Sequence, residues 1–97
     1  MRAEVQWSEQ VQSFVSSLAP EPKKKLRAGI RALADDFGDI KPLMDDLIGY
    51  NRLRIGDFRV IYRDASERGR PIRKCLFAEH RNVVYEIFRK MVLDDIR

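Results

Sequence analysis

Apolar and charged side chains alternate in residues 50–62, the most informative stretch of the chain. Two alternating runs are separated by Gly56-Asp57, a dipeptide that tolerates positive φ and suits a two-residue hairpin loop. One face of this hairpin carries apolar side chains: Leu53, Ile55, Phe58, Val60 and Tyr62. The other face carries arginines: Arg52, Arg54, Arg59 and Arg63. The pattern therefore predicts two antiparallel strands with a core face and an arginine face.

The two-residue loop fixes which residues of the hairpin lie opposite each other. Ile55 pairs with Phe58 in this register, and Arg54 lies directly opposite Arg59. Like charges that face each other across two strands are destabilising. A fold keeps such a pair more readily when an anion neutralises it, so we take the arginine face as the candidate working surface.

The N-terminal half has the pattern of one strand followed by two helices. Ala3, Val5 and Trp7 alternate with polar residues, which predicts a short strand over residues 2–7. Ser8 is the expected N-cap of a helix whose apolar positions are Val11, Phe14, Val15 and Leu18. The segment 20–22 (Pro-Glu-Pro) ends that helix and opens the next. The second helix has the apolar stripe Leu26, Ile30, Leu33 and Phe37, with Gly38 as the expected C-cap. Its lysines Lys23, Lys24 and Lys25 indicate a solvated face, with a peripheral RNA contact as the alternative.

The remaining segments complete a β-α-α-β-β-β order. Residues 39–49 are expected to form a connecting loop, with Leu43, Leu47 and Ile48 against the core. Residues 64–71 are a predicted polar loop, 72–78 a strand and 79–82 a turn. Spacing of Ile87, Phe88, Met91 and Val92 is compatible with a final amphipathic helix. The expected fold class is α+β, a helical hairpin packed on a small, mostly antiparallel sheet.

Length and composition limit the class of protein. Ninety-seven residues with 44% apolar side chains predict a single globular domain over residues 1–97. No apolar run approaches the roughly 20 residues of a membrane span, and the first ten residues have no signal-peptide pattern. The single cysteine, Cys75, fits a reducing compartment. We therefore expect a cytoplasmic protein without a membrane partner.

The net charge of +4 is unevenly distributed along the chain. Residues 1–48 carry seven basic against eight acidic side chains, whereas residues 49–97 carry twelve against seven, and ten of those twelve are arginine. Arginine matches phosphate geometry better than lysine does, so the basic half favours RNA, DNA or an acidic protein as partner. Asp45 and Asp46 have no His or Cys at ligand spacing, and the sequence contains no glycine-rich phosphate loop. No metal site and no cofactor are expected.

Two segments carry a family resemblance. The run RLRIGDFRVIY (residues 52–62), followed by HRNVVY (residues 80–85), resembles the RelE/ParE superfamily of bacterial toxins from toxin–antitoxin operons. The order of elements, the length and the basic second half agree with this resemblance. It implies a β-α-α-β-β-β toxin domain that a cognate antitoxin wraps and holds inactive, with operator DNA bound only through the antitoxin complex.

The resemblance implies a ribosome-dependent endoribonuclease. RelE-like members cleave mRNA in the ribosomal A site without a metal, by 2′-hydroxyl attack on the adjacent phosphate. Carried over to this chain, Arg54 and Arg59 would neutralise the scissile phosphate and Arg81 would stabilise the leaving oxygen. Tyr85 would stack on a base or orient the 2′-hydroxyl, and His80 is a possible general base. The residues assigned to RNA binding are Arg52, Arg63 and Tyr50.

Two other functions remain open within the same family. ParE-like members share the fold but poison DNA gyrase, and a degenerate member would bind only its antitoxin and operator DNA. Some RelE-like enzymes carry lysines as base candidates on the first hairpin strand, where this chain has Tyr50, Arg52 and Arg54. Arginine stays charged and is a poor proton acceptor, which leaves His80 or Tyr85 to act as base. We expect the antitoxin to cover the arginine face or to displace the C-terminal helix from Glu86 onward.

Overall fold

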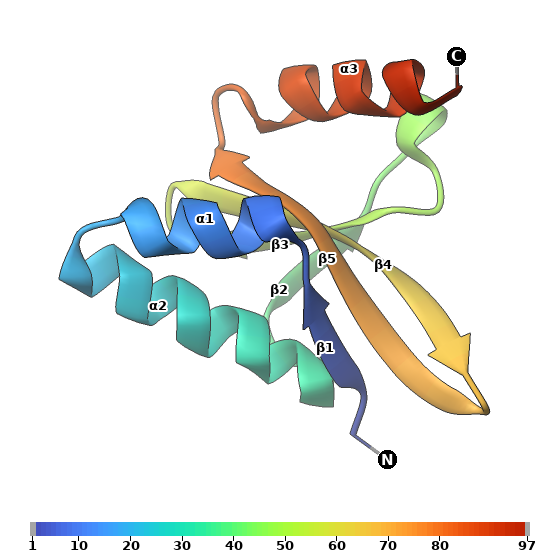
Figure 1. Ribbon diagram of the computed structural model, residues 1–97, viewed down its shortest axis with the longest axis horizontal. Helices are drawn as coiled ribbons and strands as arrows, with labels where there is room; N and C mark the ends of the chain where they lie inside the picture. The colour runs from blue at the N-terminus through green and yellow to red at the C-terminus, as the bar shows by residue number, and fades with distance from the viewer. Residues whose placement is uncertain (1, 97) are drawn as a thin grey trace.

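A five-stranded sheet forms the framework of the protein, and the computed structural model describes residues 2–96. The strands are β1 (Glu4–Trp7), β2 (Asp39–Pro42), β3 (Asn51–Ile55), β4 (Phe58–Glu67) and β5 (Arg70–His80). The helices are α1 (Glu9–Ser17), α2 (Pro20–Arg31) and α3 (Val84–Ile96), with short 3₁₀ turns η1 (Ala32–Asp35) and η2 (Asp45–Leu47). The strand order is β1-β5-β4-β3-β2, and only the β1–β5 pair is parallel. Figure 1 shows α1 and α2 side by side against the sheet, with α3 lying separately near the end of β5.

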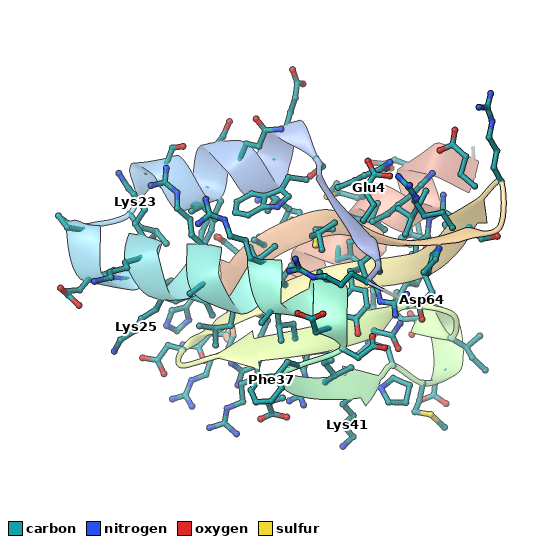
Figure 2. All side chains as sticks on the ribbon, turned by 90° about the horizontal axis from the view of Figure 1, so that it is seen from below. Glu4, Lys23, Lys25, Phe37, Lys41 and Asp64 are labelled. Carbon is teal, nitrogen blue, oxygen red and sulfur yellow. The ribbon has the colours of Figure 1, made fainter. Side chains whose placement is uncertain are left out.

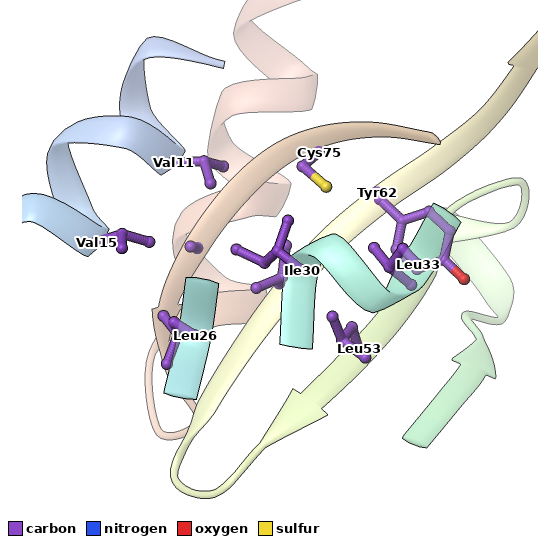
Figure 3. Packing of buried hydrophobic residues seen from close by; sticks show 10 residues of the cluster. Val11, Val15, Leu26, Ile30, Leu33, Leu53, Tyr62 and Cys75 are labelled. Carbon is purple, nitrogen blue, oxygen red and sulfur yellow. The ribbon is translucent and has the colours of Figure 1, made fainter. Parts of the chain in front are cut away.

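The helical hairpin covers one face of the sheet, as the sequence predicts. The Ser8 hydroxyl oxygen caps α1 by accepting from the Val11 N–H (3.2 Å), and it donates to the Leu76 carbonyl oxygen (2.9 Å). The first core lies between these helices and the strands (Figure 3). Its buried members are Val11, Val15, Leu26, Ile30, Leu33, Leu53, Val60, Tyr62, Cys75 and Ala78. These apolar contacts fix the helices on the core face of the β3–β4 hairpin.

A side-chain amide joins α1 to the edge of β5. The Gln10 Nε2 donates to the Ala78 carbonyl oxygen (2.7 Å), and the Gln10 Oε1 accepts from the Ala78 N–H (2.8 Å). Strand β1 pairs with β5 only as far as Cys75, so these two bonds continue the pairing beyond its end. The backbone groups of Ala78 are thereby satisfied by a side chain.

A second core covers part of the opposite face. Its buried members are Leu47, Ile61, Phe77, Val84 and Phe88, contributed by η2, two strands and α3. The expectation of one continuous arginine face is therefore only partly right, because Ile61 lies between two arginines and is fully buried. A bulge supports this packing: Ile61 pairs with Phe77 but Tyr62 pairs with Cys75, which leaves Leu76 as an extra residue in β5.

The predicted loop over residues 39–49 is partly wrong, since it contains strand β2. Residues 39–42 pair with residues 51–54 of β3 in antiparallel register. The strand is short and ends in Pro42, which is tolerated at a sheet edge but hides the strand pattern in the sequence. Leu47 is buried as expected, whereas the Ile48 residue is 74% exposed instead of packed against the core.

The predicted end of the second helix is also wrong. Helix α2 ends at Arg31 and continues as the 3₁₀ turn η1, which Asp36 terminates in a left-handed conformation (φ 54°). The tighter turn shifts later residues away from the apolar stripe. Phe37 is consequently 75% exposed, and Gly38 is not the helix cap.

Most of the predicted polar loop 64–71 belongs to a long β ribbon. Strand β4 continues to Glu67 and β5 begins at Arg70, so only Arg68 and Gly69 form the turn, both with positive φ. Neither face of this ribbon has the apolar alternation that reveals a half-buried strand. The Arg73 guanidinium stabilises it by ion pairs with Asp64 (3.2 Å) and with Asp36 (2.6 Å). Within residues 2–96 no helix is long and apolar enough to cross a membrane.

Replacing Phe88 with Ala tests the second core. Its ring packs edge-on against Tyr50 (centroids 5.0 Å apart) and beside Phe77 (6.2 Å). We expect Phe88→Ala to lower the free energy of unfolding by about 3–5 kcal/mol in urea titrations. Met91→Ala, on the exposed side of the same helix, is the matched control and should cost less than about 1 kcal/mol. Equal losses from both substitutions would contradict the packing of α3 described here.

The thiol of Cys75 should be unreactive in the folded protein. Burial in the first core raises its pKa to about 12, which suppresses the reactive thiolate. We expect the native protein to react with a colorimetric thiol reagent at neutral pH at least about a hundredfold more slowly than the protein in guanidinium chloride. Similar rates in the two conditions would mean that the Cys75 side of the core is open to solvent.

Candidate functional site

The tip of the β3–β4 hairpin organises the candidate site, and its register agrees with the prediction. Ile55 pairs with Phe58, Leu53 with Val60, and Arg54 with Arg59. Gly56 has a positive φ of 59°, which a glycine adopts without strain. The tight loop therefore brings the two arginines directly opposite each other.

Four charged residues form a row across the sheet at this end. Arg54 pairs with Asp39 of β2 on one side and with Arg59 on the other, and Arg59 in turn pairs with Glu79 of β5. Residues directly opposite in antiparallel strands project from the same face, so the charges run acidic, basic, basic, acidic. We call Asp39, Arg54, Arg59 and Glu79 the arginine row. The two outer carboxylates place negative charge on the same face as the arginines, and the Asp39 carboxylate itself accepts a hydrogen bond from Arg52 (3.0 Å).

Arg59 is the central cation of the row, and it is less exposed than its position on the arginine face implies. The residue is only 9% exposed. Its Nη1 donates two hydrogen bonds, to the carbonyl oxygens of Gly56 and Phe58 (2.9 Å each). These bonds fold the side chain back onto the hairpin tip and compensate its desolvation. Among the described residues no carboxylate lies within ion-pair distance of the Arg59 guanidinium. Its N–H groups other than those on Nη1 are available as donors to an oxyanion.

Arg81 reaches the same end of the sheet from beyond β5. Its backbone N–H donates to the Asp57 carbonyl oxygen (2.8 Å), and its Nε lies 3.7 Å from the Asp57 Oδ1. Asp57 is therefore a partner of Arg81. The structure therefore places Arg54, Arg59 and Arg81 at the same end of the sheet, beside the hairpin tip.

His80 lies on the other side of the sheet from these arginines. It pairs with Phe58, its ring contacts the Phe58 ring edge-on (6.2 Å), and Phe58 in turn packs on Phe14 of α1. The His80 Nδ1 accepts from the Asn82 N–H (3.3 Å). Successive strand residues point to opposite faces, so the imidazole is directed toward the helical layer and away from Arg59.

Tyr85 lies on the same side as the arginine row but in a different setting. It is half-buried in the first turn of α3 and packs against the second core. With Leu43, Leu47 and Arg89 it lines a small hollow of about 220 Å³. Arg89 forms an ion pair with Asp46 of η2 (2.9 Å), which connects α3 to the loop. The contacts of Tyr85 are therefore with α3 and η2.

The three residues assigned to RNA binding are dispersed. Arg52 pairs with Asp39 (3.0 Å), its side chain is 16% exposed, and its Nε is buried without a hydrogen-bond partner. Tyr50 packs on Phe88 in the second core. Arg63 is exposed, opposite Lys74, and lies about 13 Å along β4 from Arg59. The arrangement gives Arg52 and Tyr50 structural contacts, and their RNA-binding roles stay predictions.

Sequence reasoning missed the two carboxylates of the row. The sequence pattern predicts a loop where β2 lies, which hides Asp39, and a turn where β5 ends, which hides Glu79. The pairing of Glu79 with Arg59 also depends on the bulge at Leu76, which no alternation pattern in the sequence reveals. In the part of the chain that the structure describes, no group of three or more His, Cys, Asp or Glu residues gathers into a metal-binding cluster.

Solved structures share this fold at low sequence identity. A chain of the toxin–antitoxin complex RelBE2 from Mycobacterium tuberculosis matches with a TM-score of 0.69 and 20% identity, over 84% of this chain and 93% of that chain. The YoeB/ParE toxin from Agrobacterium tumefaciens gives 0.64 and 19%, over 79% and 97% of the two chains. A chain of the archaeal RelE–RelB complex from Pyrococcus horikoshii gives 0.63 and 24%, over 84% and 97%. No protein-family model matches the sequence, and neither does any curated protein.

These likenesses concern the fold. The expected α+β class is confirmed, with three helices and a five-stranded mixed sheet in which β2 is an addition to the predicted order.

Substitutions of the two facing arginines should separate their structural contributions. Arg59→Ala removes two hydrogen bonds to the hairpin tip and should lower the free energy of unfolding by about 1–3 kcal/mol. Arg54 is exposed and is the matched control, with an expected change within about 0.5 kcal/mol in the same urea titration. If Arg54→Ala destabilised the protein as much as Arg59→Ala, the distinction between a buried and an exposed cation would be wrong.

Proposed function

We propose that this chain, whose fold is that of the RelE/ParE toxins, is the toxin of a type II toxin–antitoxin module and cleaves mRNA on the ribosome. The observation that carries the proposal is the grouping of Arg54, Arg59 and Arg81 at the hairpin tip. Arg59 supports it most strongly, because a nearly buried cation held only by backbone carbonyl oxygens is ready to bind an oxyanion.

The reaction would use the RNA's own 2′-hydroxyl as nucleophile. Its oxygen bonds to the adjacent phosphorus, the bond to the 5′-oxygen breaks, and the products are a cyclic phosphate and a free 5′-hydroxyl end. Arg54 and Arg59 would bind the phosphate oxygens, whose charge increases in the transition state. Arg81 would lie toward the leaving oxygen, which must gain a proton.

A proton acceptor for the 2′-hydroxyl is also required. His80 is poorly placed for this role, because its ring contacts Phe58 on the helical side of the sheet. Glu79 is better placed, because it lies opposite Arg59 in the arginine row and a carboxylate can accept a proton. We assign the base to Glu79, and Tyr85 would contribute by stacking on a base at the edge of the site.

The partner that this proposal requires is a cognate antitoxin. The solved complexes from Mycobacterium tuberculosis and Pyrococcus horikoshii are toxin–antitoxin complexes by their own description. In this chain the antitoxin would cover the arginine row or displace α3, which exposes Ile87, Met91 and Leu93 on its outer side. Operator DNA would be bound only through that complex.

One observation favours a gyrase inhibitor as the second candidate. The separation of His80 from the arginines leaves the site without an imidazole base, as a pure binding surface would be. In that case the arginine row would contact a protein, and RNA chemistry would be absent.

Cleavage of a defined message on programmed ribosomes tests the proposal. The wild-type protein should cut at the A-site codon, read by primer extension. Arg54→Ala should lower the rate by about a hundredfold or more while leaving the fold intact, because it removes a donor to the transition state. Glu79→Gln should also lower the rate, because the amide cannot accept the proton of the 2′-hydroxyl.

Arg68→Ala, at the distant β4–β5 turn, is the matched control and should cleave like the wild type. An intact message in the presence of folded wild-type protein would refute the nuclease. Loss of DNA supercoiling in the same preparation would then support the gyrase candidate.

A further inference from the structure

Helix α2 carries a second cluster of positive charge that the proposed site does not use. Lys23, Lys24, Arg27 and Arg31 lie on the outer side of this helix, and the last three are exposed. None of them forms an ion pair with a described residue. We call these four residues the α2 stripe. Figure 2 shows Lys23 and Lys25 on the helical layer, with Lys41 at the β2 edge of the sheet. Helix α2 packs on the face of the sheet that carries Leu53 and Val60, whereas the arginine row projects from the other face, so the stripe and the row face different directions.

The α2 stripe borders a shallow groove. Helical spacing places residues 20, 23, 24, 27, 28 and 31 on one side of α2. These six residues line a hollow of about 460 Å³, with Pro20 and Ala28 as its small apolar members. Arg31 also lines a second hollow with Arg2, Val5 and Trp7. The two hollows share Arg31, so the basic groove continues from α2 toward β1.

The arrangement is unfavourable for the helix by itself. Lys23 and Arg27, and Arg27 and Arg31, are like-charge pairs at i, i+4 spacing. The lysines also lie near the N-terminal end of the helix, where the macrodipole disfavours positive charge. A polyanion in the groove would relieve both effects.

The lining of the groove favours nucleic acid over protein. Protein interfaces are centred on large apolar or aromatic anchors. The hollow along α2 contains only Pro20 and Ala28 between its cations, and Val5 and Trp7 lie outside the stripe, in the second hollow toward β1. A line of Lys and Arg without such anchors is typical of contacts to a phosphate backbone, which hold nucleic acid without reading its sequence.

We propose that the α2 stripe is a second RNA-binding surface, which holds the phosphate backbone of a structured RNA. The choice of RNA over DNA rests on the proposed function, because that RNA would be part of the ribosome. Since the stripe and the arginine row lie on opposite layers of the fold, one short strand cannot occupy both. The protein would therefore lie between two RNA segments, one cleaved at the arginine row and one bound at the α2 stripe.

The salt dependence of RNA binding tests this inference. The test variant is the triple substitution Lys24→Gln, Arg27→Gln and Arg31→Gln. The matched control removes the same number of charges elsewhere, with Arg68→Gln, Arg70→Gln and Lys90→Gln, all exposed. Binding of an RNA duplex to the full chain is measured over a range of salt concentrations, with circular dichroism to confirm folding.

The plot of log affinity against log salt has a negative slope. The α2 variant should reduce the magnitude of that slope by roughly 2 to 3, and the control variant by less than about 1. Trp7 is the single tryptophan of the chain and lines the hollow beside Arg31, so duplex RNA should also change its fluorescence in the wild type and not in the α2 variant. Equal slopes for the two variants, as expected of a merely solvated helix or of a surface for an acidic protein, would overturn the inference.

The ribosome assay separates this inference from the proposed function. The α2 variant should need at least about tenfold more protein for half-maximal cleavage, with an unchanged rate at saturation. If the wild type binds duplex RNA through α2 but cleaves no message, only the proposed nuclease activity is refuted. If the wild type cleaves the message and the α2 variant binds RNA as the control variant does, only the second RNA-binding surface is refuted.

Discussion

Burial of strand β4 on both faces is the constraint on which the rest of the structure depends. Val60 and Tyr62 contact the first core, under α1 and α2, whereas Ile61 between them contacts the second core, under α3. A shift of the register by one residue would exchange these faces and place the wrong side chains in each core. The bulge at Leu76 lets β5 follow the same division. With β4 fixed from both sides, the tip of its hairpin holds Arg59 in a defined position, where it can bond to the Gly56 and Phe58 carbonyl oxygens.

Local periodicity in the sequence, together with the Gly56-Asp57 loop, was sufficient to predict the elements whose apolar positions recur regularly. The hairpin register, the helical pair and the fold class all followed from it. The errors occurred where alternation is absent or ambiguous. Strand β2 is four residues long and ends in a proline, and the outer ribbon of β4 and β5 carries too few apolar side chains to show an alternation, although its Ile72 is buried. The apolar stripe predicted for α3 is half right, because Phe88 and Val92 pack in the second core whereas Ile87 and Met91 are exposed. Which residues are covered depends on contacts between α3 and segments distant in the sequence.

The candidate site was predicted in part for the same reason. The facing arginines followed from one short loop, and Arg81 was assigned to the same site from the family resemblance. The position of His80 depends on where β5 ends, which no local pattern shows. Its ring turns to the helical layer because β5 continues through residue 80 in register with Phe58. The same extension places Glu79 beside Arg59, so a single boundary decides which titratable group shares the face of the arginines.

The amide of Gln10 has a consequence for how copies of this protein meet. A sheet edge with free N–H and C=O groups can recruit a strand from another molecule, and such pairing leads to aggregation. Beyond the end of β1, the edge of β5 would offer such groups at Ala78, but the Gln10 side chain occupies both of them. The Ser8 hydroxyl occupies the neighbouring Leu76 carbonyl oxygen. The start of α1 thus occupies this stretch of the β5 edge, so a strand from a second copy of the chain cannot pair there unless α1 first moves away.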